Sequence, residues 1–239
     1  MAVSDRSREL RQARDAGHLE LGELHWVRFN RRANGEDAAE TVEMSKARKL
    51  RCEACGERVP SHEVVSFRNA VGGYRDLCGQ CFNAEVARLT GNDKFEDFRI
   101  EPIRLVDCAG ETHDFHFRTR LLGHIVTMDA FELHDGNPSG YQCEIAGDPE
   151  DDLLELLGRL VERLRRMLAV KYLSCEDIEP QIAEQTVRGR IDWDDSVGGQ
   201  TPLLTIDGRD VSWEEFGRML MTFEGWQFRL QIIDPTDEP

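Results

Sequence analysis

The sequence has no long apolar run and none of the short motifs that mark phosphate-binding loops or hydrolase nucleophiles. No stretch of its 239 residues approaches the about 20 consecutive apolar residues that a membrane-spanning helix needs. The chain begins MAVSDRSRELRQARDAG, which is charged and lacks the apolar centre of a secretory signal. Neither the P-loop pattern nor GxGxxG nor GxSxG occurs. These absences favour a cytoplasmic protein and give no support to the enzyme classes that depend on those motifs.

Positive charge is scarce and unevenly spread. The chain carries 30 Lys+Arg against 46 Asp+Glu, a net charge of −16. Residues 95–239 alone carry 14 and 31, a net charge of −17, whereas residues 1–50 carry +1 and residues 51–94 are neutral. Because so acidic a surface repels phosphate backbones, any contact with nucleic acid has to use the front of the chain.

A basic cluster at the front of the chain is the one candidate phosphate-binding face. Its members lie just before and within the cysteine-rich stretch, and they are Lys46, Arg48, Lys49, Arg51, Arg58, Arg68 and Arg75. Acidic residues lie among them, so a solvated surface of mixed charge is the alternative interpretation.

Four of the seven cysteines have the spacing of a metal site. Two Cys-x-x-Cys pairs, Cys52/Cys55 and Cys78/Cys81, are separated by 22 residues. Two residues between paired cysteines let one tight turn present two sulfurs to one ion, and four thiolates suit tetrahedral zinc. The spacing predicts a structural zinc ion in a closed site with no position for a catalytic water. A redox dithiol or a pair of disulfides is the alternative.

The residues between and after the cysteine pairs predict a small finger. Residues 62–68 and 74–77 have strand character and flank a turn-rich link, and a short helix follows Cys81 and stops at Gly91. A knuckle, a hairpin and a helix that carries the last two ligands resemble a treble-clef finger. The resemblance covers about 40 residues and implies a structural metal site and no particular activity.

Three further residues of the finger carry interpretations of their own. Gly56 follows the first cysteine pair and Gly79 lies inside the second, and we expect both to relieve crowding where the backbone turns around the metal. His62 could replace one of the cysteines as a ligand, but four thiolates make it surplus, so we interpret it as an ordinary hairpin residue.

The other three cysteines are scattered, and seven cysteines with four at metal spacing suit a reducing cytoplasm. Cys143 alternates with Tyr141 and Ile145, which predicts buried packing on one face of a strand. Neither Cys108 nor Cys175 has a recognisable nucleophile setting.

The middle of the chain predicts an antiparallel sheet covered by a helix. Four strand-like stretches are joined by short links, at 98–110, 112–123, 124–133 and 140–147, with a turn at 135–140. A long amphipathic helix over 149–173 follows, with Asp148 as its N-cap. Packing this helix on the sheet buries the apolar faces of both, so the fold class is α+β.

The tail predicts a second strand-and-helix unit. Residues 188–195 suit a strand or a connector, and LLTIDGRDV suits a hairpin around Asp207-Gly208. Ser212 and Glu215 form a capping box at the start of a helix. After Gly225, WQFRLQII alternates apolar and polar residues and predicts a final strand. We interpret Trp213 and Trp226 as core or interface aromatics.

A resemblance accompanies the tail. The stretch IDGRDVSWEEFGRMLMTFEGWQFRLQIID resembles a C-terminal segment of bacterial proteins of an uncharacterised family, often behind a zinc finger. The resemblance implies a bacterial cytoplasmic origin and a fold of sheet and helix, and it transfers no activity. We divide the chain into an N-terminal helical or polar segment (1–45), a zinc-binding module with four cysteines (46–94) and an acidic α+β domain (95–239). Division of the last into sub-units 95–178 and 188–239 is the alternative.

Two groups of residues are candidates for a catalytic or second metal site. His113, His116, His124 and His134 lie near Asp114, Asp129 and Asp135 in the sequence, but His113 and His116 point to opposite faces of a strand. The acidic group Asp192, Asp194, Asp195, Asp207 and Asp210 matches no EF-hand spacing, so a solvated loop is the alternative.

Three functions therefore stay open. The first is a non-catalytic protein-interaction module, which the closed metal site and the acidic second half favour. The second is a nucleic-acid-associated regulator that binds through Lys46 to Arg75. The third is an enzyme whose site uses His113, His116 or the acids from Asp192 to Asp210.

Overall fold

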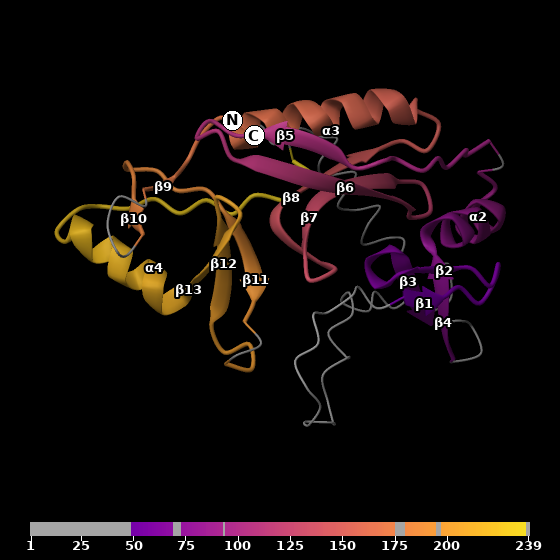
Figure 1. The fold of residues 1–239 in the computed structure, drawn as a ribbon, viewed down its shortest axis with the longest axis horizontal. Coiled ribbons are helices and arrows are strands. Elements are labelled where there is room, and N and C mark those ends of the chain that lie inside the picture. Colours follow the sequence, from indigo (N-terminus) through magenta and orange to yellow (C-terminus); the bar gives the residue numbers. More distant parts are fainter. Residues whose placement is uncertain (1–48, 69–72, 93, 175–179, 195–196, 238–239) are drawn as a thin grey trace.

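The fold is given by a computed structural model that describes residues 49–68, 73–92, 94–174, 180–194 and 197–237 (Figure 1). The N-terminal segment 1–45, together with Lys46, Arg48, Cys175 and Asp195, lies outside the described residues. The architecture is α+β, as predicted, with a finger and a C-terminal unit at opposite ends of a central sheet. The domain boundaries drawn from the sequence stay a prediction.

The finger contains two small antiparallel ribbons and one helix. Its elements are β1 (Lys49–Arg51), β2 (Arg58–Pro60), the 3-10 turn η1 (Ser61–Glu63), β3 (Val64–Arg68), β4 (Tyr74–Cys78) and α2 (Gly79–Thr90). β1 pairs with β2 and β3 pairs with β4. Gly91 ends α2 with a φ of 73°, the left-handed cap that glycine adopts at little cost. The predicted hairpin and helix are confirmed.

The central sheet is the predicted antiparallel meander. Its strands lie in the order β5 (Ile103–Val106), β6 (Thr112–Leu121), β7 (Val126–His134) and β8 (Asn137–Gly147). The turn predicted over 135–140 is shorter than expected, because only Asp135 and Gly136 lie between β7 and β8. Both have positive φ, 51° and 77°, which matches the two-residue hairpin turn that the twist of antiparallel strands favours.

The helix α3 (Leu153–Leu168) covers one face of this sheet (Figure 1). Its leucines at 153, 156, 160, 164 and 168 are buried against Phe115, Met128 and Ile145. The predicted bounds were too wide, because the cap is Asp152, which accepts from Leu154 N, and not Asp148. The apolar stripe begins only at Leu153, so the acidic turn before it stays outside the helix.

The C-terminal unit joins a two-stranded ribbon to a three-stranded sheet and a helix. Its elements are β9 (Leu173–Ser174), β10 (Gln181–Ile182), β11 (Arg190–Trp193), β12 (Pro202–Ile206), β13 (Arg209–Ser212), α4 (Trp213–Leu220) and the 3-10 turn η2 (Met221–Phe223). The turn at Asp207-Gly208 and the capping box of Ser212 and Glu215 are confirmed. The strand predicted over 226–233 is wrong, since these residues form no strand.

Two junctions hold the three parts together. β5 pairs with β6 only as far as Phe115. Beyond that point the side chain of Asn83 on α2 bonds the backbone of β6. It donates to Thr119 O at 2.9 Å and accepts from Leu121 N at 2.8 Å. At the other end, Asp207 accepts from the backbone N–H groups of Tyr172 and Leu173 at 2.7 Å. Among the described residues, no helix is long and apolar enough to cross a membrane.

Candidate metal centre

The first pair of cysteines lies on a knuckle between β1 and β2. Gly56 N donates to Cys52 O and Cys52 N donates to Glu57 O, both at 2.9 Å, so the chain reverses tightly around the two sulfurs. Gly56 has a φ of 77°, which a residue with a Cβ adopts only at a cost. The prediction for Gly56 is therefore confirmed.

The second pair lies where β4 becomes α2. Cys78 is the extended N-cap residue of the helix and Cys81 is in its first turn. The strand thus delivers one sulfur and the helix the other. Gly79 has no positive φ, and a Cβ added there would meet only Glu63 O at 4.0 Å, an ordinary contact. The prediction that Gly79 relieves crowding is wrong, because the helix start itself makes the turn.

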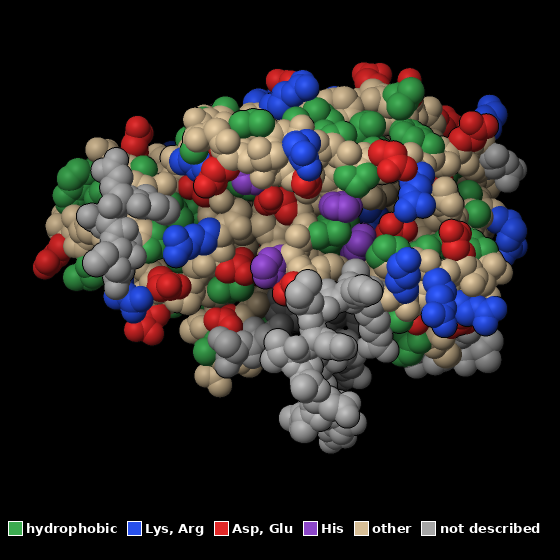
Figure 2. All heavy atoms as spheres, viewed as in Figure 1, with side chains coloured by type: hydrophobic (Ala, Val, Ile, Leu, Met, Phe, Trp, Pro, Cys, Tyr) green, Lys and Arg blue, Asp and Glu red, His purple; other side chains and the backbone are tan. Residues whose placement is uncertain are grey.

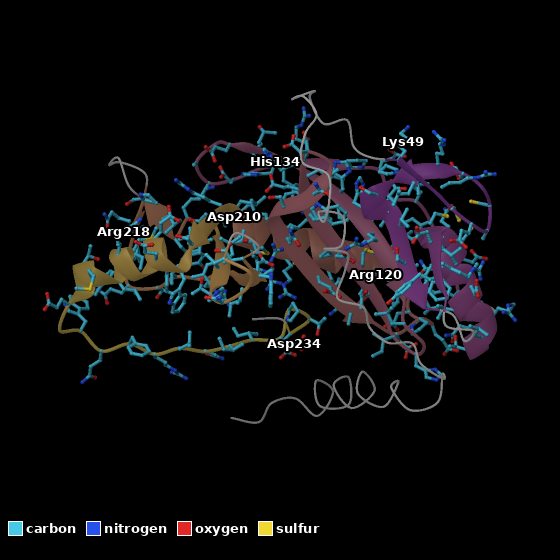
Figure 3. The ribbon with its side chains drawn as sticks, turned by 90° about the horizontal axis from the view of Figure 1, so that it is seen from below. Lys49, Arg120, His134, Asp210, Arg218 and Asp234 are labelled. Carbon is cyan, nitrogen blue, oxygen red and sulfur yellow. The ribbon has the colours of Figure 1, made fainter. Side chains whose placement is uncertain are left out.

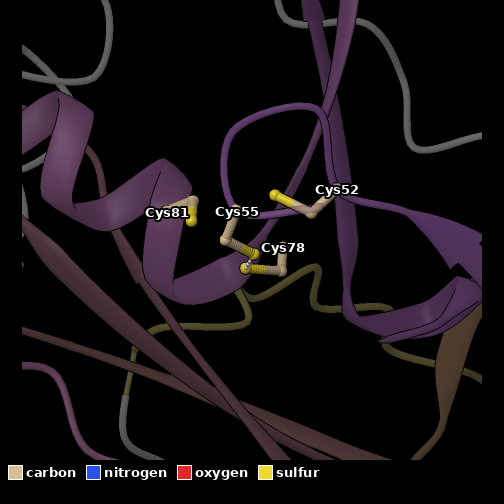
Figure 4. A group of neighbouring side chains, drawn as sticks. All are labelled: Cys52, Cys55, Cys78 and Cys81. Atoms are coloured by element: carbon tan, nitrogen blue, oxygen red, sulfur yellow. Dashed lines mark hydrogen bonds between the residues drawn. The ribbon is translucent and has the colours of Figure 1, made fainter. Parts of the chain in front are cut away.

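The two pairs bring four sulfurs together (Figure 4). All four Sγ atoms lie within 4.8 Å of one another, and Cys55 Sγ is 4.0 Å from Cys78 Sγ. A tetrahedral ion with zinc–sulfur bonds of about 2.3 Å holds its sulfurs about 3.8 Å apart. The cluster therefore has the size and the donor chemistry that a four-thiolate metal site needs.

The thiols differ in how easily they ionise. Burial raises the pKa of Cys52, but hydrogen bonds from the backbone at Cys55, Cys78 and Ala54 outweigh it and lower that pKa to about 6. Burial and the neighbouring thiols raise the pKa of Cys81 above its usual range, and burial raises that of Cys78. One thiolate thus forms readily, whereas further negative charge in the cluster needs a cation to balance it.

Polar contacts tie the knuckle to the hairpin. Glu53 N donates to Asp76 O at 2.9 Å, and Asp76 N donates back to the Glu53 carboxylate at 3.1 Å. Arg75 bonds the Glu85 carboxylate of α2 at 3.1 Å and lies 3.8 Å from that of Glu53. These bonds fix the two cysteine pairs relative to each other, and sequence spacing alone gave no sign of them.

His62 does not lie at the metal cluster. It is buried in η1, where Nδ1 lies 3.3 Å from Gly136 O and the ring stacks edge-on against His116 and Phe131. Burial lowers its pKa. Arg118 of β6 also donates to His62 O at 3.0 Å. His62 is thus a buried contact between the finger and the central sheet, and its interpretation as an ordinary hairpin residue missed this role.

The described members of the basic cluster split into two sets. Lys49, Arg51 and Arg58 lie on the β1–β2 ribbon, with Arg51 directly opposite Arg58 and both exposed. Figure 2 shows Lys and Arg side chains gathered over this end of the molecule, beside acidic ones. Arg75 is instead paired with Glu85. The backbone of Arg68 ends β3, and its side chain lies outside the described set.

The candidate histidines do not converge. His113 faces Tyr141 and Asp107, whereas His116 stacks on Phe131 at the opposite face, as the strand alternation predicted. His134 is exposed beside Asp135. Two of the candidate acids pair with arginines instead: Asp129 with Arg118 and Arg120, and Asp114 with Arg104.

A polar network around Asp107 was not predicted. His113 lies 3.2 Å from the Asp107 carboxylate and 2.9 Å from that of Glu132, and Lys171 Nζ lies 2.6 Å from Asp107. Asp107, Glu111 and His113 offer oxygen and nitrogen atoms at metal-site distances. Because the Lys171 ammonium already neutralises the buried Asp107 carboxylate, this group is better explained as an internal ion pair than as a second metal site.

The acids of the C-terminal unit divide in the same way. Asp192 and Asp210 both accept from Thr205 Oγ1, at 2.9 and 3.1 Å, on one face of the three-stranded sheet. Asp207 is occupied by backbone N–H groups at the junction, and Asp194 O accepts from Gly199 N at 2.7 Å. The described members of this group therefore do not gather around one point.

Comparison with known proteins finds three matches, each to a domain of unknown function. DUF7685 matches residues 51–93, DUF7686 matches residues 96–169 and DUF7713 matches residues 172–237. No curated protein and no solved structure matches the chain. The four cysteines lie within the first match, the central sheet and α3 within the second, and the C-terminal unit within the third. The chain is therefore similar, in three consecutive segments, to three domain families to which no activity is assigned.

Proposed function

We propose that this protein is a non-catalytic, cytoplasmic protein-interaction module whose finger is held together by a structural zinc ion. The observation that carries the proposal is the cluster of Cys52, Cys55, Cys78 and Cys81, whose sulfurs lie within 4.8 Å of one another. Four thiolates complete a tetrahedral shell, so the ion would stabilise the fold and would leave no position for substrate.

The interaction part of the proposal rests on what surrounds the finger. The candidate catalytic residues of the described chain are divided between opposite faces of the sheet or engaged in ion pairs. The C-terminal unit instead exposes large apolar side chains, including Trp213, Met221, Trp226 and Phe228. Exposed apolar groups gathered on one unit favour binding to another macromolecule.

The zinc is tested by metal analysis of the purified protein and of a Cys78→Ser/Cys81→Ser variant. We expect one zinc per chain in the parent and none in the variant, with loss of folded structure over residues 52–90 measured by hydrogen exchange. Cys108→Ser is the matched control, because Cys108 is an exposed cysteine outside the cluster. Full folding of the double variant without metal would contradict the structural role.

The interaction is tested by purification from the native host under mild conditions after nuclease treatment. We expect a protein to co-purify at a fixed ratio and to be lost in the Cys78→Ser/Cys81→Ser variant. A partner that stays bound to the metal-free double variant would show that the finger is not needed for the interaction.

Binding to nucleic acid is the second candidate. It is favoured by the exposed Lys49, Arg51 and Arg58 on one ribbon of the finger. Such binding weakens steeply as salt rises, because each neutralised phosphate releases counterions. Absence of binding at low salt, or the same affinity in an Arg51→Gln/Arg58→Gln variant, would count against it.

A further inference from the structure

The stretch from Trp226 to Ile233, here called the C-terminal strap, is extended but belongs to no sheet, and all of its residues are exposed. It follows a turn at Glu224 and Gly225, where Gly225 has a φ of 85°. Figure 3 shows the strap as a nearly straight trace that runs from the end of α4 to Asp234, apart from the strands. A segment of a folded unit that contacts so little of its own chain needs a physical explanation.

The strap has the side-chain pattern of a strand that covers one apolar face. Its alternate residues are large and apolar, and their exposed fractions are 62% for Trp226, 91% for Phe228, 74% for Leu230 and 68% for Ile232. The residues between them are Gln227, Arg229 and Gln231. Monomeric proteins rarely leave such a row open to water, and a contiguous exposed apolar row marks an interaction surface.

The strap is tethered at both ends and its backbone is open between them. At its start Trp226 N donates to Phe223 O at 2.9 Å, and beyond its end Arg163 donates to Asp237 O at 3.0 Å. Among the described residues, no hydrogen bond reaches the backbone of residues 227–233. An extended segment with open N–H and C=O groups is a template for the addition of another strand.

The charges on the strap disfavour pairing with a second copy of this chain and favour a different protein as the partner. An antiparallel pairing of two copies that sets Trp226 opposite Ile232 places Arg229 opposite Arg229. Like charges directly opposite each other destabilise a strand pair. Residues 172–239 also carry 15 Asp+Glu against 5 Lys+Arg, a net charge of −10, so two copies repel each other.

We propose that the C-terminal strap binds an extended segment of another protein by strand addition, and that this segment is apolar on alternate residues, basic at its ends and acidic at its centre. Basic ends would lie near Glu224 and Asp234, which flank the strap, and an acidic centre would lie opposite Arg229. The inference rests on the proposed function of a protein-interaction module and names its binding surface and the chemistry of its partner.

The test uses two synthetic peptides of the same length and apolar content. The matching peptide is Lys-Thr-Val-Thr-Ile-Glu-Val-Thr-Phe-Thr-Lys, and the reversed peptide exchanges its Lys and Glu residues. Affinity for the full-length protein is measured by calorimetry. We expect the matching peptide to bind about tenfold more tightly at low salt, with the ratio shrinking at about 0.5 M salt.

Three variants locate the binding on the strap. Phe228→Ser/Leu230→Ser should abolish binding of the matching peptide. Arg229→Glu should reduce the preference for the matching peptide, because it makes one of that peptide's three charge contacts repulsive and one of the reversed peptide's contacts attractive. Leu154→Ser should bind as the parent does, since Leu154 is an exposed leucine on α3, 64% accessible, away from the strap. The strap variants change only exposed side chains, and thermal unfolding checks that they fold as the parent does.

Each outcome decides the inference. Equal affinity for the two peptides, or no binding of either, overturns it. A dimer seen by sedimentation and lost in Phe228→Ser/Leu230→Ser also overturns it, in favour of a second copy of the chain. Failure here leaves the proposed function standing if the native partner is still lost in Cys78→Ser/Cys81→Ser, so the two proposals fail separately.

Discussion

Asn83 offers the sharpest test of how the finger is joined to the central sheet. Its side chain is fully buried and makes three hydrogen bonds, accepting from Leu121 N at 2.8 Å and donating to Thr119 O at 2.9 Å and to the Asp97 carboxylate at 2.6 Å. The amide therefore satisfies backbone groups on the open edge of β6, as the backbone of a neighbouring strand would. Asn83→Leu removes the amide and keeps the number and branching of the side-chain heavy atoms.

The expected cost follows from the groups that this change leaves behind. Leu121 N–H and Thr119 C=O stay buried without a partner, and each such group costs about 1–3 kcal/mol. Together they should lower the free energy of unfolding by about 2–6 kcal/mol, a large part of the 5–15 kcal/mol of a typical domain. Asn83→Asp keeps the acceptor for Leu121 N but turns a carboxylate toward Thr119 O and Asp97, so it should be at least as damaging at neutral pH.

Urea denaturation with the metal content held equal measures this cost. Gln80→Leu is the matched control, because it removes an exposed amide from the same helix. A free energy of unfolding for Asn83→Leu within about 0.5 kcal/mol of the Gln80→Leu value would refute the reasoning. It would mean that the edge of β6 finds other partners, such as water, when the amide is gone.

Two further predictions concern the junctions. Lys171→Met should lower the free energy of unfolding by about 1–3 kcal/mol, because it leaves the buried Asp107 carboxylate without its ammonium partner. Arg104→Met is the control, since Arg104 pairs with Asp114 at an exposed site, and it should change the free energy little in the same urea titration. The hydrogen bond from Lys171 lowers the pKa of Asp107 in the folded protein. The stabilisation is therefore present above the unfolded pKa of about 3.9 and is lost as the pH falls below it. The free energies of unfolding of the parent and of Lys171→Met should become equal in acid. Gly208→Ala should cost about 2 kcal/mol in thermal unfolding, since the residue has a φ of 74° and its Cβ would lie 2.8 Å from the Tyr141 ring. Gly198→Ala has a similar φ with open space around it and should cost about half as much; equal losses would contradict the role of the Tyr141 contact.

Much of the architecture is predictable because it depends on local signals. The spacing of the four cysteines, the turn at Asp207-Gly208 and the capping box at Ser212 each involve residues close in sequence, and the structure places all of them as predicted. The helix α3 was predicted from its stripe of leucines, but its start was misplaced. Three aspartates before Leu153 compete as caps, Asp148, Asp151 and Asp152, and only the contact of the helix with the sheet decides among them.

The residues that sequence reasoning missed act across long separations. Asn83 bonds residues 36 and 38 positions away, and His62 contacts Gly136 across 74 positions. A lone polar residue on an apolar helix face, flanked by the buried Phe82 and Val86, was the signal available for Asn83. The strap was mispredicted for the opposite reason, because its alternation correctly indicates a strand-like surface, yet the described chain supplies no neighbouring strand to pair with it.

The position of Asn83 also bears on what a metal ion in the finger would stabilise. Asn83 lies in the helix turn that follows Cys81, and α2 buries Phe82 and Val86 with Leu121 of β6. An ion that holds Cys78 and Cys81 fixes the first turn of α2, and through it the amide that satisfies the β6 edge. Loss of the metal should therefore expose the backbone of β6 near Thr119 and Leu121 as well as the finger. The C-terminal unit lies at the other end of the sheet, where Gly208 approaches Tyr141 of β8 and Asp207 bonds the backbone of Tyr172 and Leu173, and it does not share these contacts. The metal would then act as a stabiliser of the finger and of one sheet edge.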